Sequence, residues 1–255
     1  MSINMDEEGK MIAVMKDKKN KIKELIFVNP EDKQGIKKMK LRDDNVFEPV
    51  LDTESRSIVY ICGASGSGKS TLARILVDNF HATFPDAQIY MFSRLSSDVA
   101  FDDLEKKKVL IRIPIDNDLV KSSIDVVNDI EYGSMVIFDD IDTISDKKIM
   151  GALNNIKLQI LEIGRHKKIY CIVTSHLINT GDRTGTRTMM NEMSSLVIFP
   201  RGGGSVYQQR YCLKNYLGLS NDQVDDILST SDSRWVLISK NYPQYILTQK
   251  KVYIN

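Results

Sequence analysis

Short apolar blocks separated by polar stretches recur along the chain, in a regular order from residue 57 on. β-branched, apolar runs of the kind that form buried strands occur at residues 57–62, 88–92, 108–113, 134–138, 168–174 and 195–199. Stretches with helical spacing lie between several of these runs, at residues 69–82, 118–130, 145–163 and 185–194. Strands that alternate with helices predict an α/β fold with a mostly parallel central sheet and helices on both faces.

The two ends of the chain differ from this regular middle part. Residues 1–55 carry basic clusters at 16–23 and 37–42 and one strand-like stretch at 24–28. We therefore expect a basic arm with capping strands, which is either simply solvated or docks on a partner or on DNA. The predicted core then spans residues 56–200.

Residues 201–255 are expected to extend the same domain. A glycine-rich link follows Pro200, and Ser220 with Gln223 forms a capping-box pattern at the start of a short helix. The apolar runs at 235–239 and 244–248 flank a Lys-Asn-Tyr-Pro turn and predict a C-terminal β-hairpin.

The stretch from Gly63 to Ser70 reads G-x-x-x-x-G-K-S and lies between a predicted strand and a predicted helix. This is the context of a phosphate-binding loop, in which glycines let backbone N–H groups turn toward an anion at a helix N-terminus. Lys69 is expected to reach the β- and γ-phosphates from solvent, and the Ser70 hydroxyl to ligate Mg²⁺. The predicted nucleotide-binding residues are Gly63, Ala64, Ser65, Gly66, Ser67, Gly68, Lys69, Ser70 and Thr71.

Two later apolar strands end in polar residues. The first ends in Asp139 and Asp140, and the second in Thr174, Ser175 and His176. Ligands of parallel α/β sheets bind at the carboxyl ends of the strands. Asp139 is therefore a candidate Mg²⁺ ligand, Asp140 a candidate catalytic base, and His176 either a γ-phosphate sensor or an ordinary surface histidine.

Asp142 is a weaker candidate, because its position suits a helix cap. Arg165 follows the long helix and precedes a strand, which is compatible with favourable charge at a helix end or with an arginine finger for a neighbouring subunit. We expect this junction to lie at the nucleotide-facing edge of the sheet. Arg94, Arg183 and Arg187 are the alternative fingers.

Composition narrows these possibilities only in part. The formal net charge is +1, so no global basic field indicates nucleic acid. The chain shows no long apolar span and no apolar signal core at its N-terminus, which predicts a protein that is not secreted. The three cysteines, Cys62, Cys171 and Cys212, lie in or beside apolar runs and are expected to be buried thiols in a reducing compartment.

Together the motifs at 63–71, 136–140, 164–166 and 172–176 resemble, in order and spacing, the FtsK–HerA superfamily. The best match is its viral branch, the poxvirus-type packaging ATPases of large DNA viruses and virophages. The resemblance covers about residues 57–200. It implies an ATP- and Mg²⁺-dependent motor, assembled as a hexameric or pentameric ring, that pumps double-stranded DNA into a capsid. It also implies capsid partners at a vertex and a location in the host cytoplasm, a viral factory or the virion.

The resemblance maps the family's catalytic residues onto Lys69, Ser70, Asp139, Asp140 and Arg165. The chain departs from the family at two positions. Asp140 stands where glutamate is more usual, and His176 where the sensor is usually glutamine. A small-molecule kinase, which would need an acceptor pocket, and a non-catalytic nucleotide switch are the alternative functions.

Overall fold

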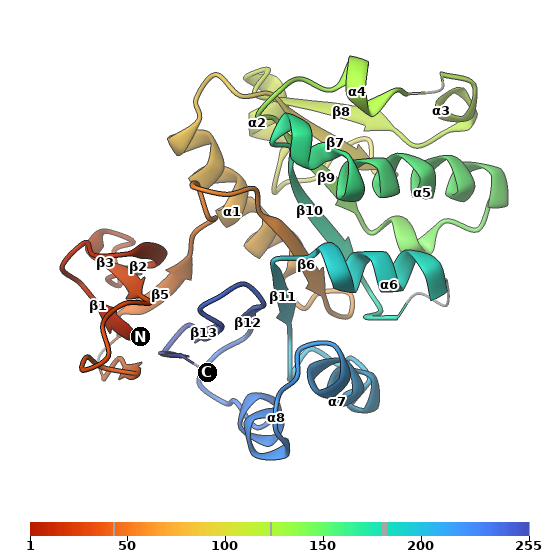
Figure 1. Ribbon diagram of the computed structural model, residues 1–255. Coiled ribbons are helices and arrows are strands. Elements are labelled where there is room, and N and C mark those ends of the chain that lie inside the picture. Colours follow the sequence, from red (N-terminus) through yellow and green to blue (C-terminus); the bar gives the residue numbers. More distant parts are fainter. Residues whose placement is uncertain (43, 123, 180–182, 255) are drawn as a thin grey trace.

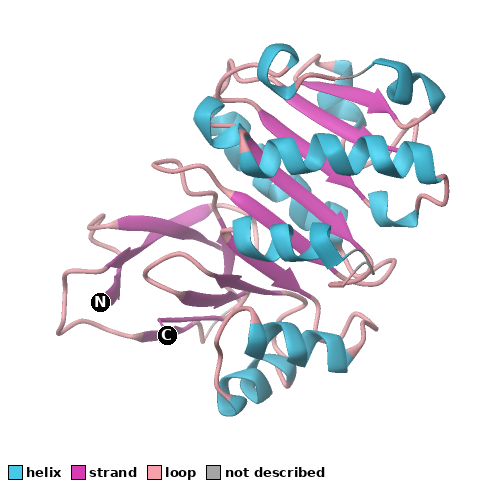
Figure 2. Ribbon diagram, turned by 45° about the vertical axis from the view of Figure 1, so that its right-hand side comes forward, coloured by secondary structure: helices cyan, strands magenta, loops and turns pink. Residues whose placement is uncertain are grey.

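The computed structural model describes residues 1–42, 44–122, 124–179 and 183–254. Within these residues a ten-stranded sheet forms the centre of the molecule, with helices on either side of it (Figures 1 and 2). Its strands, in spatial order, are β4 (Lys38–Lys40), β14 (Lys251–Ile254), β13 (Tyr245–Thr248), β12 (Val236–Ser239), β11 (Ser195–Ile198), β6 (Ile58–Cys62), β10 (Tyr170–Ser175), β9 (Met135–Asp139), β7 (Ile89–Ser93) and β8 (Leu110–Pro114).

The strands from β11 to β8 in this order are parallel, and β12, β13, β14 and β4 continue the sheet in antiparallel pairs. This arrangement confirms the predicted mostly parallel α/β sheet. The six predicted core strands and the C-terminal hairpin are all present. Strands β14 and β4 extend that hairpin beyond the prediction.

Burial on both faces explains why the parallel strands read as continuous apolar runs. In β6, Ile58, Tyr60 and Cys62 belong to the core cluster on one face, and Val59 and Ile61 to the cluster on the other. Helix α1 (Lys69–Thr83) covers the second face, whereas α5 (Lys147–Glu162) and α6 (Arg183–Glu192) cover the first (Figure 1).

The remaining helices are short, with ten residues or fewer. Two of them, α3 and α4, replace the single helix predicted at 118–130, where Asp129 accepts a hydrogen bond from the backbone of Asp125 (2.8 Å) and so caps a new helix start. The capping box at Ser220 is confirmed. The short helices are α2 (Asp102–Lys106), α3 (Asn117–Ser122), α4 (Val126–Asp129), α7 (Val206–Asn215), α8 (Asn221–Leu228) and the 3₁₀ turns η1 (Ile141–Thr143) and η2 (Gly164–Lys167).

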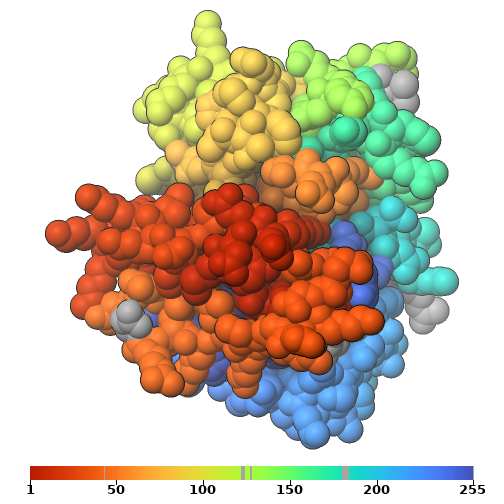
Figure 3. All heavy atoms as spheres, turned by 60° about the vertical axis from the view of Figure 1, so that its left-hand side comes forward, coloured from red at the N-terminus to blue at the C-terminus, as the bar shows by residue number. Residues whose placement is uncertain are grey.

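The N-terminal segment is more ordered than the expected arm. It forms a four-stranded antiparallel sheet from β1 (Ser2–Asn4), β3 (Ile22–Asn29), β2 (Lys10–Lys16) and β5 (Val46–Pro49). The segment therefore has more strands than the expected arm with capping strands, and buried residues such as Ile12, Ile26 and Phe47 join this sheet to the core beside α1. Figure 3 shows the N-terminal segment (red and orange) beside atoms of the C-terminal part of the chain (blue), and the backbone of Phe47 donates to Gln249 O (2.9 Å).

The three cysteines are free and buried, as predicted. None of the described helices is long and apolar enough to cross a bilayer.

Candidate functional site

The predicted phosphate loop connects β6 to α1 at the carboxyl edge of the parallel strands. Its backbone begins with a hydrogen bond from Gly63 N to Ser175 O (3.0 Å). Gly66 (φ 74°) and Gly68 (φ 110°) adopt the left-handed conformation that glycine tolerates best. A methyl group at Gly63 would lie only 2.5 Å from Oγ of Ser67, so that position also requires glycine.

Lys69 lies under this loop rather than in solvent. It is 5% exposed, its Nζ donates to Gly63 O (2.9 Å), and it lies 3.4 Å from Oδ2 of Asp140. The expectation of a solvated lysine is therefore wrong. The loop folds over the side chain and holds its charge beside the acidic strand, where a bound phosphate can take the place of the carboxylate.

Asp139 is anchored at the end of β9 by two hydroxyl groups. Its Oδ1 lies 3.1 Å from Oγ1 of Thr174 and its Oδ2 3.2 Å from Oγ of Ser93. Burial, followed by the neighbouring charge of Asp140, raises the pKa of the Asp139 carboxyl above its ordinary value. A divalent cation would offset both effects, and the Asp139 carboxylate offers the oxygen ligands that Mg²⁺ prefers.

Asp140 has a left-handed backbone (φ 45°), which is uncommon for a residue with a side chain. Its N–H donates to Oγ1 of Thr174 (2.8 Å), and its carboxylate is about one-third exposed, at 32%. The turn directs this carboxylate to Lys69 and toward the space above the phosphate loop. This position beside Lys69 and His176 is compatible with the predicted role of Asp140 as a catalytic base.

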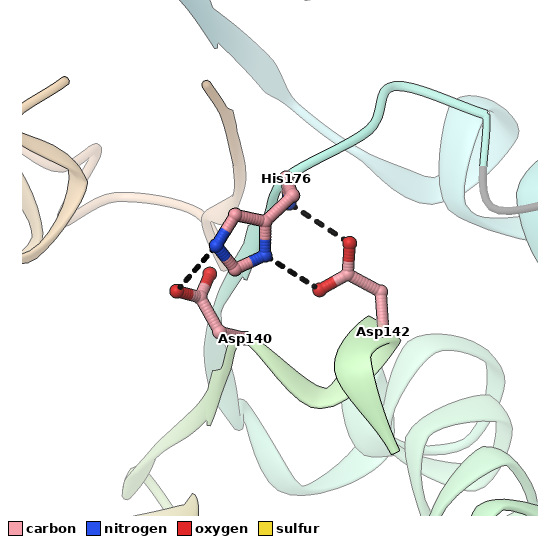
Figure 4. A group of neighbouring side chains, drawn as sticks. All are labelled: Asp140, Asp142 and His176. Carbon is pink, nitrogen blue, oxygen red and sulfur yellow. Dashed lines mark hydrogen bonds and ion pairs between the residues drawn. The ribbon is translucent and has the colours of Figure 1, made fainter. Parts of the chain in front are cut away.

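His176 lies between two carboxylates (Figure 4). Its Nδ1 is 3.4 Å from Oδ1 of Asp142, and its Nε2 is 3.4 Å from Oδ2 of Asp140 and 3.1 Å from Oγ of Ser65 in the phosphate loop. Because an ionised Asp142 only accepts, the contact with Nδ1 is a hydrogen bond in the tautomer whose Nδ1 carries the proton. His176 therefore bridges the acidic strand and the phosphate loop, the position expected of a sensor.

The prediction for Asp142 as a mere helix cap is wrong. Oδ2 of Asp142 accepts hydrogen bonds from the backbone of His176 and from Oγ of Ser175, both at 2.9 Å. Its side chain is only 8% exposed. Asp142 thus fixes the end of β10 and the orientation of the imidazole. Ligand atoms of Asp140, Asp142 and His176 also lie within 4.8 Å of one another, a spacing at which the three groups could hold a second cation.

Arg165 lies at the opposite edge of the sheet from the phosphate loop. It belongs to η2, which precedes the amino end of β10, whereas Ser175 at the other end of that strand borders the loop. A six-residue strand separates the two by about 16 Å. The expectation that Arg165 lies at the nucleotide-facing edge is therefore wrong. The two ends of a strand lie at opposite edges of the sheet, and Arg165 precedes the amino end of β10.

The alternative arginines lie on two other elements, one of them after β7 and two in α6. Arg94 follows β7 at the carboxyl edge, where its Nη1 lies 3.4 Å from Thr143 O. Arg187 is exposed on α6. The side chain of Arg183 lies outside the part of the structure that is described.

The sequence did not show how the site residues are held: Ser93 was missed, and Thr174 and Asp142 were given no part in orienting the acidic residues or His176. Ser93 and Thr174 hold Asp139, and Asp142 holds His176. The available signal was their position, because each follows or ends an apolar strand whose carboxyl end meets the phosphate loop. Residues with hydroxyl groups are common at the ends of strands. Only the topology of the sheet therefore shows which of them face the site.

No family model matches the chain. "Uncharacterized protein V3" of Sputnik virophage is 38% identical over 244 residues, which cover 96% of this chain and 95% of that protein.

Among solved structures, the conjugation coupling protein TcpA of pCW3, with ATPγS, matches 94% of this chain and 76% of its own with a TM-score of 0.52 and 13% identity. The DNA-packaging ATPase B204 of Sulfolobus turreted icosahedral virus matches 78% of this chain and 97% of its own with a TM-score of 0.49 and 13% identity. The likeness to TcpA confirms the P-loop NTPase fold.

Proposed function

The chain belongs to the family of protein V3 of Sputnik virophage, and we propose that it is a viral genome-packaging ATPase of the FtsK–HerA type. In this function ATP hydrolysis drives double-stranded DNA into a preformed capsid. Support comes from the motif order described above, from the fold, and from the name of the structural neighbour B204, a DNA-packaging ATPase.

One observation carries the proposal. Residues from three separate segments of the chain meet at one point, where Asp140 Oδ2 lies 3.4 Å from both Lys69 Nζ and His176 Nε2, and His176 reaches Ser65 of the phosphate loop. Triphosphate hydrolysis requires a loop that binds phosphates, an acidic residue beside it and a polar group that contacts both. A non-catalytic nucleotide switch has no need of the last two.

Each residue then has a chemical task. The phosphate loop and Lys69 bind the β- and γ-phosphates, while Asp140 accepts the proton of the attacking water. His176, held by Asp142, senses the γ-phosphate and links its presence to the acidic strand. Ser70 and Asp139 would hold Mg²⁺, which neutralises charge on the phosphates when bound.

The motor is proposed to act as a ring of identical subunits on DNA of any sequence. A protein that moves a whole genome cannot depend on particular bases, so it must contact phosphates. The near-neutral net charge (+1) implies that these contacts are local patches gathered by assembly. Capsid proteins at one vertex are the proposed docking partner. The comparisons do not favour the small-molecule kinase.

The test is ATPase activity with and without double-stranded DNA. We expect stimulation by duplexes of unrelated sequence, and a steep loss of this stimulation as salt rises, because counterions compete for the phosphates. The size of the assembly is measured by native mass spectrometry with an ATP analogue and DNA. Strong sequence preference, or stimulation by a nucleoside monophosphate instead of DNA, would contradict the motor and favour a kinase.

A further inference from the structure

The outermost strands of the ten-stranded sheet, β4 and β8, lie beside segments of opposite charge. Residues 33–42, termed the basic flank, contain β4 and no acidic residue, and their basic residues are Lys33, Lys37, Lys38, Lys40 and Arg42. Residues 115–133, termed the acidic flank, follow β8, contain α3 and α4, and have Lys121 as their one basic residue. Their acidic residues are Asp116, Asp118, Asp125, Asp129 and Glu131.

The two flanks lie on different sides of the molecule. In Figure 1, α3 and α4 lie beside β8 at the top, whereas the N-terminal sheet lies at the lower left. The basic flank is joined to that sheet, because the backbone of Ile3 donates to Ile36 O (2.7 Å). The opposite charges of the flanks are therefore kept apart within one subunit.

The lysines of β4 point away from the core. Met39 packs against the core cluster that contains α1, whereas its neighbours Lys38 and Lys40 are exposed, as the alternation of a strand requires. Within the described ranges neither lysine pairs with a carboxylate, and Lys38 Nζ lies over the ring of Tyr253, 5.9 Å from its centre. Both charges are available to a partner.

The acidic residues of α3 and α4 are all exposed. Asp116 and Asp129 each accept a backbone hydrogen bond (2.8 Å) that supports the start of a short helix. Asp118 has a different role, since its carboxylate lies 2.9 Å from the exposed Nζ of Lys121. The side chains of Asp118 and Glu131 can therefore be changed without loss of a helix cap.

Each flank also carries exposed apolar side chains. Ile36 is 57% exposed next to Lys37 on the basic flank. On the other side of the molecule, Ile111 of β8 is 45% exposed and Tyr132, beside Glu131, is 64% exposed. Apolar contacts inside a charged rim are the usual composition of a protein–protein interface.

We propose that the basic flank of one subunit docks against the acidic flank of a second copy of this chain. Because the two surfaces differ and lie on different sides of the subunit, the contact is head-to-tail, the type that closes into rings. Opposite charges orient the two copies and disfavour contacts between like flanks. The inference rests on the proposed function in one respect, namely that the subunits form a ring.

The experiment reverses the charges of each flank in the full chain. Lys38→Glu with Lys40→Glu reverses the basic flank, and Asp118→Lys with Glu131→Lys reverses the acidic flank. Assembly is measured by native mass spectrometry over a range of protein concentrations, with an ATP analogue and DNA present. Each double variant is expected to need at least about tenfold more protein for half-maximal assembly, because like charges then face each other.

The decisive variant carries all four substitutions in one chain. Its flanks are again opposite in charge, so assembly should recover by at least about tenfold relative to either double variant. The control is Lys147→Glu with Lys214→Glu, two exposed lysines of α5 and α7, which changes the net charge as much as the basic-flank variant does. It should assemble like the wild type.

The other outcomes overturn the inference. Unchanged assembly of both double variants would leave the lysines of β4 only the role of preventing unwanted strand pairing at an open sheet edge. Weaker assembly without recovery in the fourfold variant would assign the flanks to other partners, such as DNA, and a wild-type chain that stays monomeric would exclude the contact. The proposed function is judged separately, by DNA-stimulated ATP turnover. A wild type that assembles through these flanks but shows no such turnover would contradict the motor and leave the interface standing.

Discussion

At the carboxyl edge of the parallel strands, short acidic and hydroxyl side chains hold one another, whereas at the amino edge long basic side chains bind backbone carbonyl groups. At the first edge, Oγ1 of Thr174 lies 3.1 Å from Oδ1 of Asp139 and 3.0 Å from Oδ1 of Asp140. At the second, Arg56 donates from Nε to Ile169 O (2.6 Å) and from Nη1 to Leu161 O (3.1 Å). The first arrangement positions reactive groups, and the second joins a helix end to two strands.

The comparison shows that the direction of a strand decides the meaning of the polar residues beside it. The same charged residue can be catalytic at one edge and structural at the other. Substitutions at the carboxyl edge should therefore change chemistry, whereas those at the amino edge should leave the chain's own site unchanged. The predictions below test this contrast, beginning with the largest expected effect.

Lys69→Ala is expected to lower ATP turnover by at least about 10²–10³-fold, the scale of losing one charged group that stabilises a transition state. It also removes the hydrogen bond to Gly63 O and leaves Asp140 without its cation. Circular dichroism must first show that the variant is folded. A folded variant with turnover near that of the wild type would refute the assignment of the phosphate loop.

Asp140→Asn is expected to slow hydrolysis by about 10²–10⁴-fold while ATP still binds. The amide keeps the shape of the side chain but cannot take a proton from water. The measurement pairs single-turnover hydrolysis with binding of a fluorescent ATP analogue. A parallel loss of binding and turnover would assign Asp140 to ligand binding instead of proton transfer.

Asp139→Asn separates metal binding from stability. In the presence of Mg²⁺ we expect ATP to bind about tenfold more weakly, because a ligand charge is lost. Without Mg²⁺ the variant should be more stable at neutral pH, with a rise in Tm of about a few degrees.

The sign of the stability effect follows from the raised pKa of Asp139. The folded protein holds this proton more tightly than the unfolded chain does, so stability falls as pH rises through the carboxyl range. The gain from asparagine should therefore vanish in acid, where both states are protonated. A lower Tm at neutral pH would show that the hydrogen bonds of Ser93 and Thr174 to the carboxylate outweigh its burial.

The sequence predicted most of the fold and the motif residues, but not the contacts that hold those residues in place. Glycine spacing and apolar runs are local signals, so the phosphate loop and the strand ending in Asp139 could be read directly. Lys69 was expected in solvent because sequence does not show that Asp140 and Gly63 enclose it. The sequence showed only one strand-like stretch of the N-terminal sheet, because β1 and β5 have only three and four residues and β2 begins and ends with lysine.

Asp142→Asn is expected to reduce turnover by about tenfold, since Asp142 acts through His176 and touches no phosphate. The paired variants His176→Gln and His176→Ala show whether a hydrogen-bonding side chain is needed at this position. Glutamine can still bridge Ser65 and the acidic strand, so it should retain more activity than alanine. If all three variants hydrolyse ATP at the wild-type rate, the bridge between the two motifs has no catalytic role.

Arg165→Ala is expected to have the smallest effect on the chain's own site. Arg165 is exposed at the amino edge, about 16 Å of strand away from Ser175. ATP binding by isolated subunits should therefore stay within about twofold of the wild type, because no contact with the chain's own phosphates is lost. An arginine so placed can still serve a neighbour, and an arginine finger is worth about 10³–10⁵ in rate. Turnover of assembled rings should then fall although binding does not.

Mixing Lys69→Ala with Arg165→Ala decides between these roles. Each variant is inactive by itself if the finger acts on a neighbour, but mixed rings contain interfaces with an intact lysine on one side and an intact arginine on the other. Part of the activity should return in rings that mass measurement shows to be mixed. Full activity of Arg165→Ala alone would show that η2 has only a structural role. Arg94, at the carboxyl edge of the sheet, would then be the next residue to test. A loss of ATP binding by isolated Arg165→Ala subunits would contradict the separation of the two edges itself.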